Sequence, residues 1–266
     1  MSLRIQNNVE AFQAHRTLNA TANAQSKSME KLSSGFRINS ASDDAAGLGI
    51  SEKMRGQIRG LAQAQRNIED GVSMVQTAEG NLDEVHSMLQ RVRELAVQYK
   101  NGSLSSTNQA AIQTEVNNLA SEISRIGTSA QFNGINVLSS ASSVTFQVGS
   151  NDGNTISVAM VSLGATVGTS FSTLSSATAL TDIDAAIDNV SAARATFGAV
   201  QNRLEHTLSV SATTQENLIS AESRIRDVDM ADEMTKLTKN QILTQAGTAM
   251  LSQANQAPQS VLSLLR

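Results

Sequence analysis

A hydrophobic repeat with a period of seven residues runs through a long stretch in each half of this chain. In the first stretch, residues 44–99, one set of positions is Leu61, Ile68, Val75, Leu82, Leu89 and Ala96. A second set follows three residues behind it: Ala64, Gly71, Ala78, Val85, Val92 and Tyr99. This spacing is typical of a helix that buries one stripe of side chains against another helix. A fully helical stretch of this length would extend for about 84 Å.

The second stretch, residues 182–229, carries the same repeat. One set is Ile183, Val190, Phe197, Leu204, Ser211, Leu218 and Ile225, and the other is Ala186, Ala193, Val200, Thr207, Thr214, Ala221 and Val228. Asp182 is the predicted N-cap of this helix. Because neither helix can bury its own stripe, we expect the two to pair antiparallel.

A shorter helix over residues 107–126 is predicted to complete the bundle. Its apolar positions are Ile112, Val116, Leu119, Ile123 and Ile126. The predicted fold class is therefore mainly α: an elongated, coiled-coil-like antiparallel bundle of long helices formed by the N- and C-terminal arms. The bundle domain is assigned to residues 44–138 and 182–229.

The middle of the chain, residues 139–181, differs in composition, because Asp152 is its single charged residue. Apolar and polar residues alternate over residues 144–148 and again over residues 156–160. Asn151, Asp152, Gly153 and Asn154 between these runs are typical turn residues. The pattern predicts one β-hairpin followed by a Ser/Thr-rich link, with no large outer domain.

The two ends, residues 1–43 and 230–266, form a third predicted region. The first has an apolar series that includes Leu3, Ile5, Val9, Phe12 and Leu18. Residues 241–265 contain no charged side chain, and they include one candidate apolar stripe. Its members are Leu243, Ala246, Met250, Ala254, Ala257, Val261 and Leu264. Two interpretations are open: these helices dock on the chain's own bundle, or neighbouring copies bury them.

Composition and motifs argue against several functions. The chain has no cysteine, a net charge of −4 and no basic patch, so we expect no thiol chemistry and no nucleic-acid partner. No apolar run approaches the length of a membrane span, and the first residues lack the apolar core of a cleavable signal peptide. Asp43 and Asp44 are interpreted as caps of a helix that begins at Asp44. We predict no catalytic residue, no metal site and no cofactor.

Four motifs together resemble one known family. Residues 32–50 read LSSGFRINSASDDAAGLGI, and this run resembles the N-terminal signature of bacterial flagellins. Residues 90–98 (QRVRELAVQ), residues 131–134 (QFNG) with Val137 and Leu138, and residues 261–266 (VLSLLR) resemble further flagellin segments. The resemblance covers about residues 1–138 and 182–266, and it identifies a short form of the family.

The resemblance implies a non-enzymatic structural subunit that assembles with itself into the extracellular flagellar filament for swimming motility. The chain ends would form the inner layer of that filament. Their self-assembly residues would be Leu3, Ile5, Val9, Phe12, Leu18, Leu243, Met250, Val261, Leu264 and Leu265. Export would proceed unfolded through the flagellar secretion apparatus. A secretion chaperone, the filament cap and the hook–filament junction proteins would be further partners.

The resemblance also implies an assembly face at Arg91, Glu94, Leu95 and Glu115, which in some flagellins contacts the vertebrate Toll-like receptor 5. Two other interpretations are open. A hook–filament junction protein has the same end architecture, and a coiled-coil binding module would have no assembly role. Glycosylation of the Ser/Thr-rich middle is also left open by the sequence.

Overall fold

The computed structural model describes residues 8–167 and 180–264. The chain divides into two compact units, which we name the terminal unit (residues up to Gly56 and from Leu218) and the central unit (Gln57–Asn217). Among the described helices, none combines the length and the hydropathy needed to cross a membrane. The mainly helical fold class and the pairing of the long N- and C-terminal helices are confirmed.

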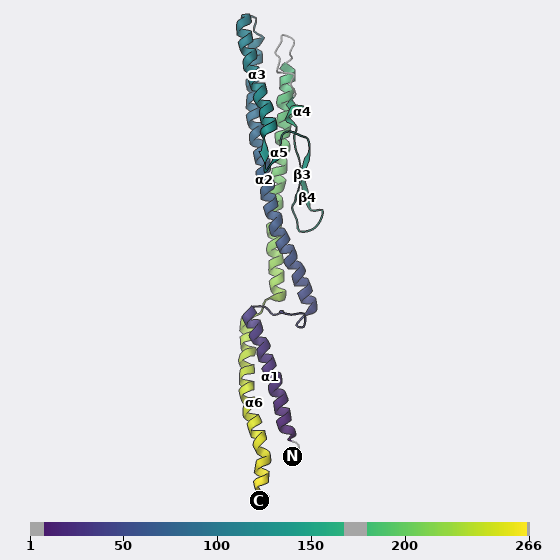
Figure 1. The fold of residues 1–266 in the computed structure, drawn as a ribbon, viewed down its shortest axis with the longest axis vertical. Coiled ribbons are helices and arrows are strands. Elements are labelled where there is room, and N and C mark those ends of the chain that lie inside the picture. Colours follow the sequence, from purple (N-terminus) through teal and green to yellow (C-terminus); the bar gives the residue numbers. More distant parts are fainter. Residues whose placement is uncertain (1–7, 168–179, 265–266) are drawn as a thin grey trace. The chain divides into compact units, whose positions relative to one another are not determined.

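Three helices build the central unit: α2 (Ala45–Tyr99), α3 (Ser106–Ser129) and α5 (Leu180–Arg226). Polar contacts fix α2 and α5 as antiparallel. Gln65 bonds to Gln215 at 2.7 Å, whereas Arg93 near the other end of α2 bonds to Asp184 at 2.6 Å. Figure 1 shows these helices lying along one another. The predicted pairing of the two heptad stretches is therefore correct.

The core of the central unit follows the predicted seam. In α2 the heptad positions from Leu61 to Ala96 are all buried, and the seam of α5 is buried from Ile183 to Ser211 except at Thr207, which is half-buried. Phe197, the largest of the fully buried side chains, is 1% exposed. Beyond Ser211 the seam of α5 carries Thr214, which is exposed, and Leu218, which is half-buried. The seven-residue repeat of α5 therefore extends beyond the part of the helix in which its positions are buried.

Two antiparallel hairpins lie between α3 and α5. The predicted one pairs β3 (Ser143–Gln147) with β4 (Thr155–Ala159) and places Phe146 opposite Ile156. Its side chains reach the helical core, since the Phe146 ring lies against Gly71 of α2. The second hairpin, β1 (Gln131–Phe132) with β2 (Ile135–Asn136), was not predicted. Asn133 and Gly134 form its turn with φ angles of 48° and 77°, as a tight hairpin turn of this type requires.

Two other details differ from the sequence prediction. The segment after the hairpin contains a short helix, α4 (Leu163–Val167), where a link was expected. Leu163 packs against Gly127 of α3, and its N–H donates to the carbonyl of Leu138. The rest of the predicted link, residues 168–179, lies outside the described residues. Because α5 is helical from Leu180 onward, Asp182 lies in its first turn and is not its N-cap.

Candidate self-assembly surface

The terminal unit is built on two helices, α1 (Val9–Ser34) and α6 (Met230–Leu264), which lie side by side and antiparallel (Figure 1). Asn8 caps α1, because its Oδ1 accepts the N–H of Ala11 at 3.0 Å. Asp229 caps α6 in the same way and accepts the N–H of Ala231 at 2.9 Å. Side-chain caps therefore define where both helices begin.

Asn8 makes a second contact, across the helix pair. Pro258 lies inside α6 and has no N–H, so the carbonyl of Ala254, four residues earlier, loses its helical donor. Asn8 Nδ2 donates to that oxygen at 2.7 Å. One amide side chain thus satisfies a backbone donor in α1 and a backbone acceptor in α6.

The seam between α1 and α6 consists mainly of small and polar side chains. On α1 the less exposed positions include Ala11, Ala14, Leu18, Thr21, Gln25 and Ser28. On α6 they are Glu233, Leu237, Asn240, Thr244, Gly247, Leu251 and Ala254. Leu18 approaches Gly247 so closely that an added Cβ there would lie 3.1 Å from its Cδ1. Thr244 donates to Gln25 at 3.3 Å.

Several large apolar side chains of this pair point away from the seam. Phe12 is 73% exposed and Val9 58% on α1, while Met250 is 63% and Leu243 45% exposed on α6. The predicted stripe of α6 through Leu243, Ala246 and Met250 is therefore not the face that contacts α1. The α1–α6 pair therefore buries Leu237 but leaves several of its large apolar side chains exposed.

Other predicted assembly residues have different positions. Leu18 is half-buried in the α1–α6 seam. Leu3, Ile5 and Leu265 lie outside the described residues. For Val261 and Leu264 the structure describes only the helical backbone of α6, so their side chains are likewise outside the description.

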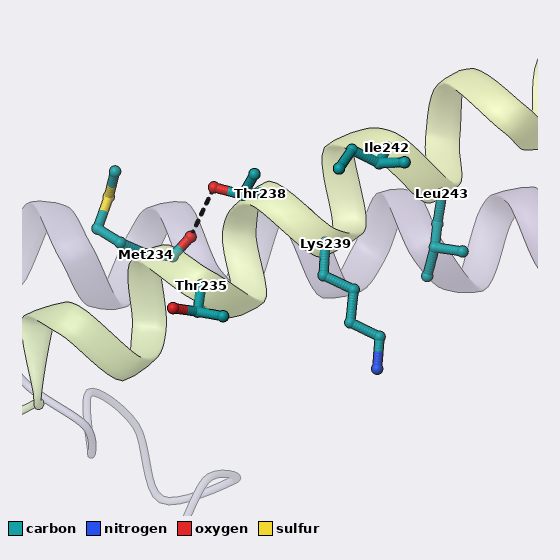
Figure 2. A pocket seen from close by; sticks show the side chains of 6 residues that line it. All are labelled: Met234, Thr235, Thr238, Lys239, Ile242 and Leu243. Carbon is teal, nitrogen blue, oxygen red and sulfur yellow. Dashed lines mark hydrogen bonds between the residues drawn. The ribbon is translucent and has the colours of Figure 1, made fainter.

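An apolar groove runs along the exposed side of α6. We call it the α6 groove, and Figure 2 shows its lining: Met234, Thr235, Thr238, Lys239, Ile242 and Leu243. Each threonine hydroxyl donates at 2.9 Å to a carbonyl one turn earlier, Thr238 to Met234 and Thr235 to Ala231. Since both hydroxyl hydrogens are engaged by the helix itself, the groove presents mostly methyl, methylene and thioether groups.

A second exposed surface lies on α1. It is lined by Val9, Phe12, Gln13, His15, Arg16 and Asn19. Phe12 is its prominent apolar group, and it is the one exposed aromatic side chain in the described parts of the chain. The terminal unit thus offers two chemically different apolar surfaces, one on each helix.

Residues 35–44 connect α1 to α2 and lie beside the end of α5. Gly35 ends α1 with a φ of 76°. Its carbonyl accepts the N–H of Val228 at 3.0 Å, and the N–H of Arg37 donates to the carbonyl of Arg226 at 2.6 Å. The Arg226 guanidinium lies 4.7 Å from the centre of the Phe36 ring. These contacts hold the connections between the helices of the terminal unit.

Two carboxylates in this part of the chain have a lowered pKa. The guanidinium of Arg226 donates to Glu52 at 2.7 Å and holds the pKa of Glu52 below its ordinary value. The backbone N–H groups of Ser40 and Asn39 donate to Asp43 and lower its pKa as well. Asp44, by contrast, accepts the N–H of Gly47 at 2.9 Å and caps α2, which begins at Ala45. The prediction that both aspartates cap this helix is therefore wrong for Asp43.

The predicted face on α2 and α3 is partly assembled. Arg91 bonds to Glu94 and to Glu115, each at 3.0 Å, and these two hydrogen bonds raise the pKa of Arg91. All three side chains are exposed. Leu95 is only 1% exposed and belongs to the core of the central unit. The exposed part of this face therefore consists of Arg91, Glu94 and Glu115.

Comparison with known proteins gives consistent matches along the chain. Residues 5–143 match the family model described as the bacterial flagellin N-terminal helical region, and residues 180–265 match that of the C-terminal helical region. A flagellin of Halalkalibacterium halodurans is 50% identical, with 98% of this chain and 99% of the relative aligned. The flagellar filament 33 kDa core protein of Treponema phagedenis is 48% identical at the same coverage.

Solved structures agree with these matches. The crystal structure of Bacillus cereus flagellin is 28% identical, with a TM-score of 0.51 over 55% of this chain and 88% of that one. A putative flagellar hook-associated protein from Vibrio parahaemolyticus gives a TM-score of 0.59 over 70% of this chain and all of that one. At 17% identity, the second match concerns the fold alone.

Proposed function

Because this chain belongs to the bacterial flagellin family, we infer that the exposed apolar surfaces of α1 and α6 join identical copies into a flagellar filament. The protein is a structural subunit of that filament, as its relatives named flagellin and flagellar filament core protein are. The interpretation as a hook–filament junction protein is not favoured by these relatives. What remains to be tested is which residues carry the assembly.

One observation supports the terminal helices as the assembly elements. Several of their large apolar side chains, including Phe12 and Met250, are exposed, although a smaller and more polar seam is buried between the two helices. Leaving such groups in water forfeits the free energy of burial, which neighbouring copies would recover. On this proposal residues 1–43 and 230–266 form the inner layer of the filament. Residues 44–138 with 182–229 form the next layer, and residues 139–181 add little outside it.

The direct test is seeded polymerisation of the purified protein. Short filament fragments added to monomer are expected to elongate, as followed by sedimentation and electron microscopy. Helical content measured by circular dichroism is expected to rise or hold during elongation. A protein that stays monomeric at high concentration, with seeds that elongate normally from a known flagellin, would contradict the proposal.

Export as an unfolded chain through the flagellar secretion apparatus belongs to the same proposal. The absence of cysteine supports it, since no disulfide can form before or after passage. A secretion chaperone would hold the C-terminal helix, and the filament cap and the junction proteins would receive the subunit. Fusion of a tightly folded domain to the chain is expected to block export in a flagellated host. Undiminished export of that fusion would contradict the unfolded route.

The face of Arg91, Glu94 and Glu115 is proposed as a lateral contact between copies. Recognition by Toll-like receptor 5 through this face stays a prediction, and its assay uses reporter cells with monomeric protein. Arg91→Ala and Glu115→Ala are expected to reduce the signal, whereas an unchanged signal would remove the assignment. Leu95→Ala is unsuitable for this assay, because Leu95 is a core residue and its loss would weaken the fold.

A further inference from the structure

We propose that the α6 groove of one copy receives the Phe12 ring of a second copy. The inference rests on the proposed assembly function and specifies which surface meets which. It commits to one occupant for the groove, an identical chain, and to one anchoring side chain.

The lining of the groove suits an aromatic ring. Met234 contributes a thioether, which packs favourably against aromatic side chains, and Ile242 and Leu243 contribute aliphatic walls. Lys239 contributes an ammonium group. The nearby acids Asp232 and Glu233 both pair with Lys236, at 2.7 and 3.3 Å, and Lys239 has no ion pair among the described residues. An unpaired cation beside an apolar wall favours the face of an aromatic ring.

Phe12 is the side chain on this molecule that fits such a groove. It is 73% exposed, and the other aromatic side chains in the described ranges are buried or half-buried. Val9, one turn earlier, extends the same apolar surface and is 58% exposed. A ring that is nearly free in the single chain has a large area left to bury, as the anchoring residues of protein interfaces do.

The groove cannot be filled by Phe12 of its own chain. Asn8 lies opposite Ala254 and Leu18 lies opposite Gly247, so Phe12 lies at the level of the part of α6 between these two residues, with its ring pointing away from that helix. Thr238, in the middle of the groove, lies nine residues before Gly247, toward the start of α6. At the rise of an α-helix this is about 14 Å, which exceeds the reach of a phenylalanine side chain. A second copy has to supply the ring.

The two surfaces differ, and this difference determines the type of assembly. A contact between Phe12 of one copy and the α6 groove of another leaves a free groove on the first and a free ring on the second. Such head-to-tail contacts extend into open helical polymers unless the rotation closes a ring. A pairing of Phe12 with Phe12 would instead stop at dimers.

Photocrosslinking within filaments tests this contact. Phe12 is replaced by p-benzoylphenylalanine, which keeps an aromatic ring, and the variant is mixed as a minor component with isotope-labelled wild-type protein before seeding. Irradiation is expected to join position 12 to residues 234–243 of the labelled chain, as identified by mass spectrometry. The control carries the same photoreactive group at Glu10, which is exposed and points to the opposite side of α1. It is expected to give no crosslink to the groove.

A second measurement, the critical concentration for elongation, tests the contact without crosslinking. Phe12→Ala is expected to raise the critical concentration for elongation about tenfold or more, whereas Phe12→Tyr leaves it nearly unchanged. Crosslinks to any site other than the groove, or an unchanged critical concentration for Phe12→Ala, would overturn the contact. In either case filaments of the wild-type protein would still support the assembly function. Failure of the wild-type protein to elongate seeds would overturn that function instead.

Discussion

The α2–α5 pair and the α1–α6 pair are both antiparallel, and both have buried positions spaced three and four residues apart. Their seams differ in chemistry. The first is filled with aliphatic side chains and Phe197, whereas the second contains Ala14, Gln25, Ser28 and Gly247. Large buried aliphatic groups contribute about 1.5–3 kcal/mol each, and small or polar ones contribute far less. The spacing of the seam residues therefore determines which faces of two helices pack together. The size and polarity of those residues determine how strongly the pair is stabilised within a single chain.

The large apolar residues also have different surroundings in the two units. In the central unit most of them face inward and stabilise the single chain, and Val97, Ile135 and Val210 are the exposed exceptions among the described residues. In the terminal unit Phe12, Ile242 and Met250 face outward, where only another molecule can cover them. On the proposed assembly, one chain combines a self-sufficient fold with a fold that neighbouring copies complete.

Removal of residues 241–266 has the largest expected effect on this contrast. The truncated chain loses most of α6 and with it the partner of α1, so seeded polymerisation is expected to fail completely. The central unit lacks none of its contacts and is expected to unfold at an unchanged temperature in circular dichroism. Robust filaments from the truncated chain would show that the outward residues are not needed for assembly.

The next largest effect is expected from a pair of phenylalanine substitutions, one in each unit, which compare how much each side chain stabilises the monomer. Phe197→Ala leaves a cavity in the central core and is expected to lower the free energy of unfolding by about 3–5 kcal/mol. Phe12→Ala in the monomer is expected to change it by less than about 0.5 kcal/mol, because the ring is exposed. Urea titrations of the two monomers measure both values. Similar losses for the two variants would remove the distinction between the seams.

A smaller effect is expected at Asn8, where polar contacts replace core packing. Asn8→Asp keeps an acceptor for the N–H of Ala11 but cannot donate to the carbonyl of Ala254. Opening of the α1–α6 pair is expected to become easier by about 1 kcal/mol, the usual value of one hydrogen bond. Amide hydrogen exchange in α1 measures this change. Protection equal to that of the wild type would mean that the contact with Ala254 contributes nothing.

The smallest expected effect concerns pH. The pKa of Glu52 is lowered by Arg226, so this interaction stabilises the terminal unit above the ordinary glutamate value of 4.5. The contribution is lost as the pH falls through the lower, folded-state pKa. Glu52→Gln is therefore expected to weaken the protein slightly at pH 7 and less at pH 3, with Glu10→Gln as the control. Urea titrations at both pH values check this, and an equal effect at both would contradict the ion pair.

The central unit could be predicted from the sequence because its seam uses large aliphatic residues at a regular spacing. The β3–β4 hairpin followed from simple alternation around Gly153. Leu95 was misjudged as part of an exposed face, since α2 packs against α3 as well as α5 and buries a third row of side chains. The Asn133–Gly134 turn was visible in the sequence, but its two-residue strands are too short for a periodic signal.

The terminal pair could not be read in the same way. Ala11, Leu18 and Gln25 stand seven residues apart, but a hydrophobic pattern does not register alanine and glutamine as a seam. The pattern of α6 instead drew attention to Leu243 and Met250, which lie on its exposed side. Two seven-residue repeats of small residues, one in each terminal segment, would have been the sequence signal for the α1–α6 seam. The partner of the exposed side is set by other molecules and is not encoded as a local pattern.

The contact between Asn8 and Ala254 joins residues 246 positions apart in sequence. The ribosome must therefore release the chain past Ala254 before this contact between α1 and α6 can form. Throughout synthesis the N-terminal segment has no α6 to pair with, and it remains accessible to any factor that binds nascent chains. The order of the elements along the chain thus delays closure of the terminal unit until α6 has been translated.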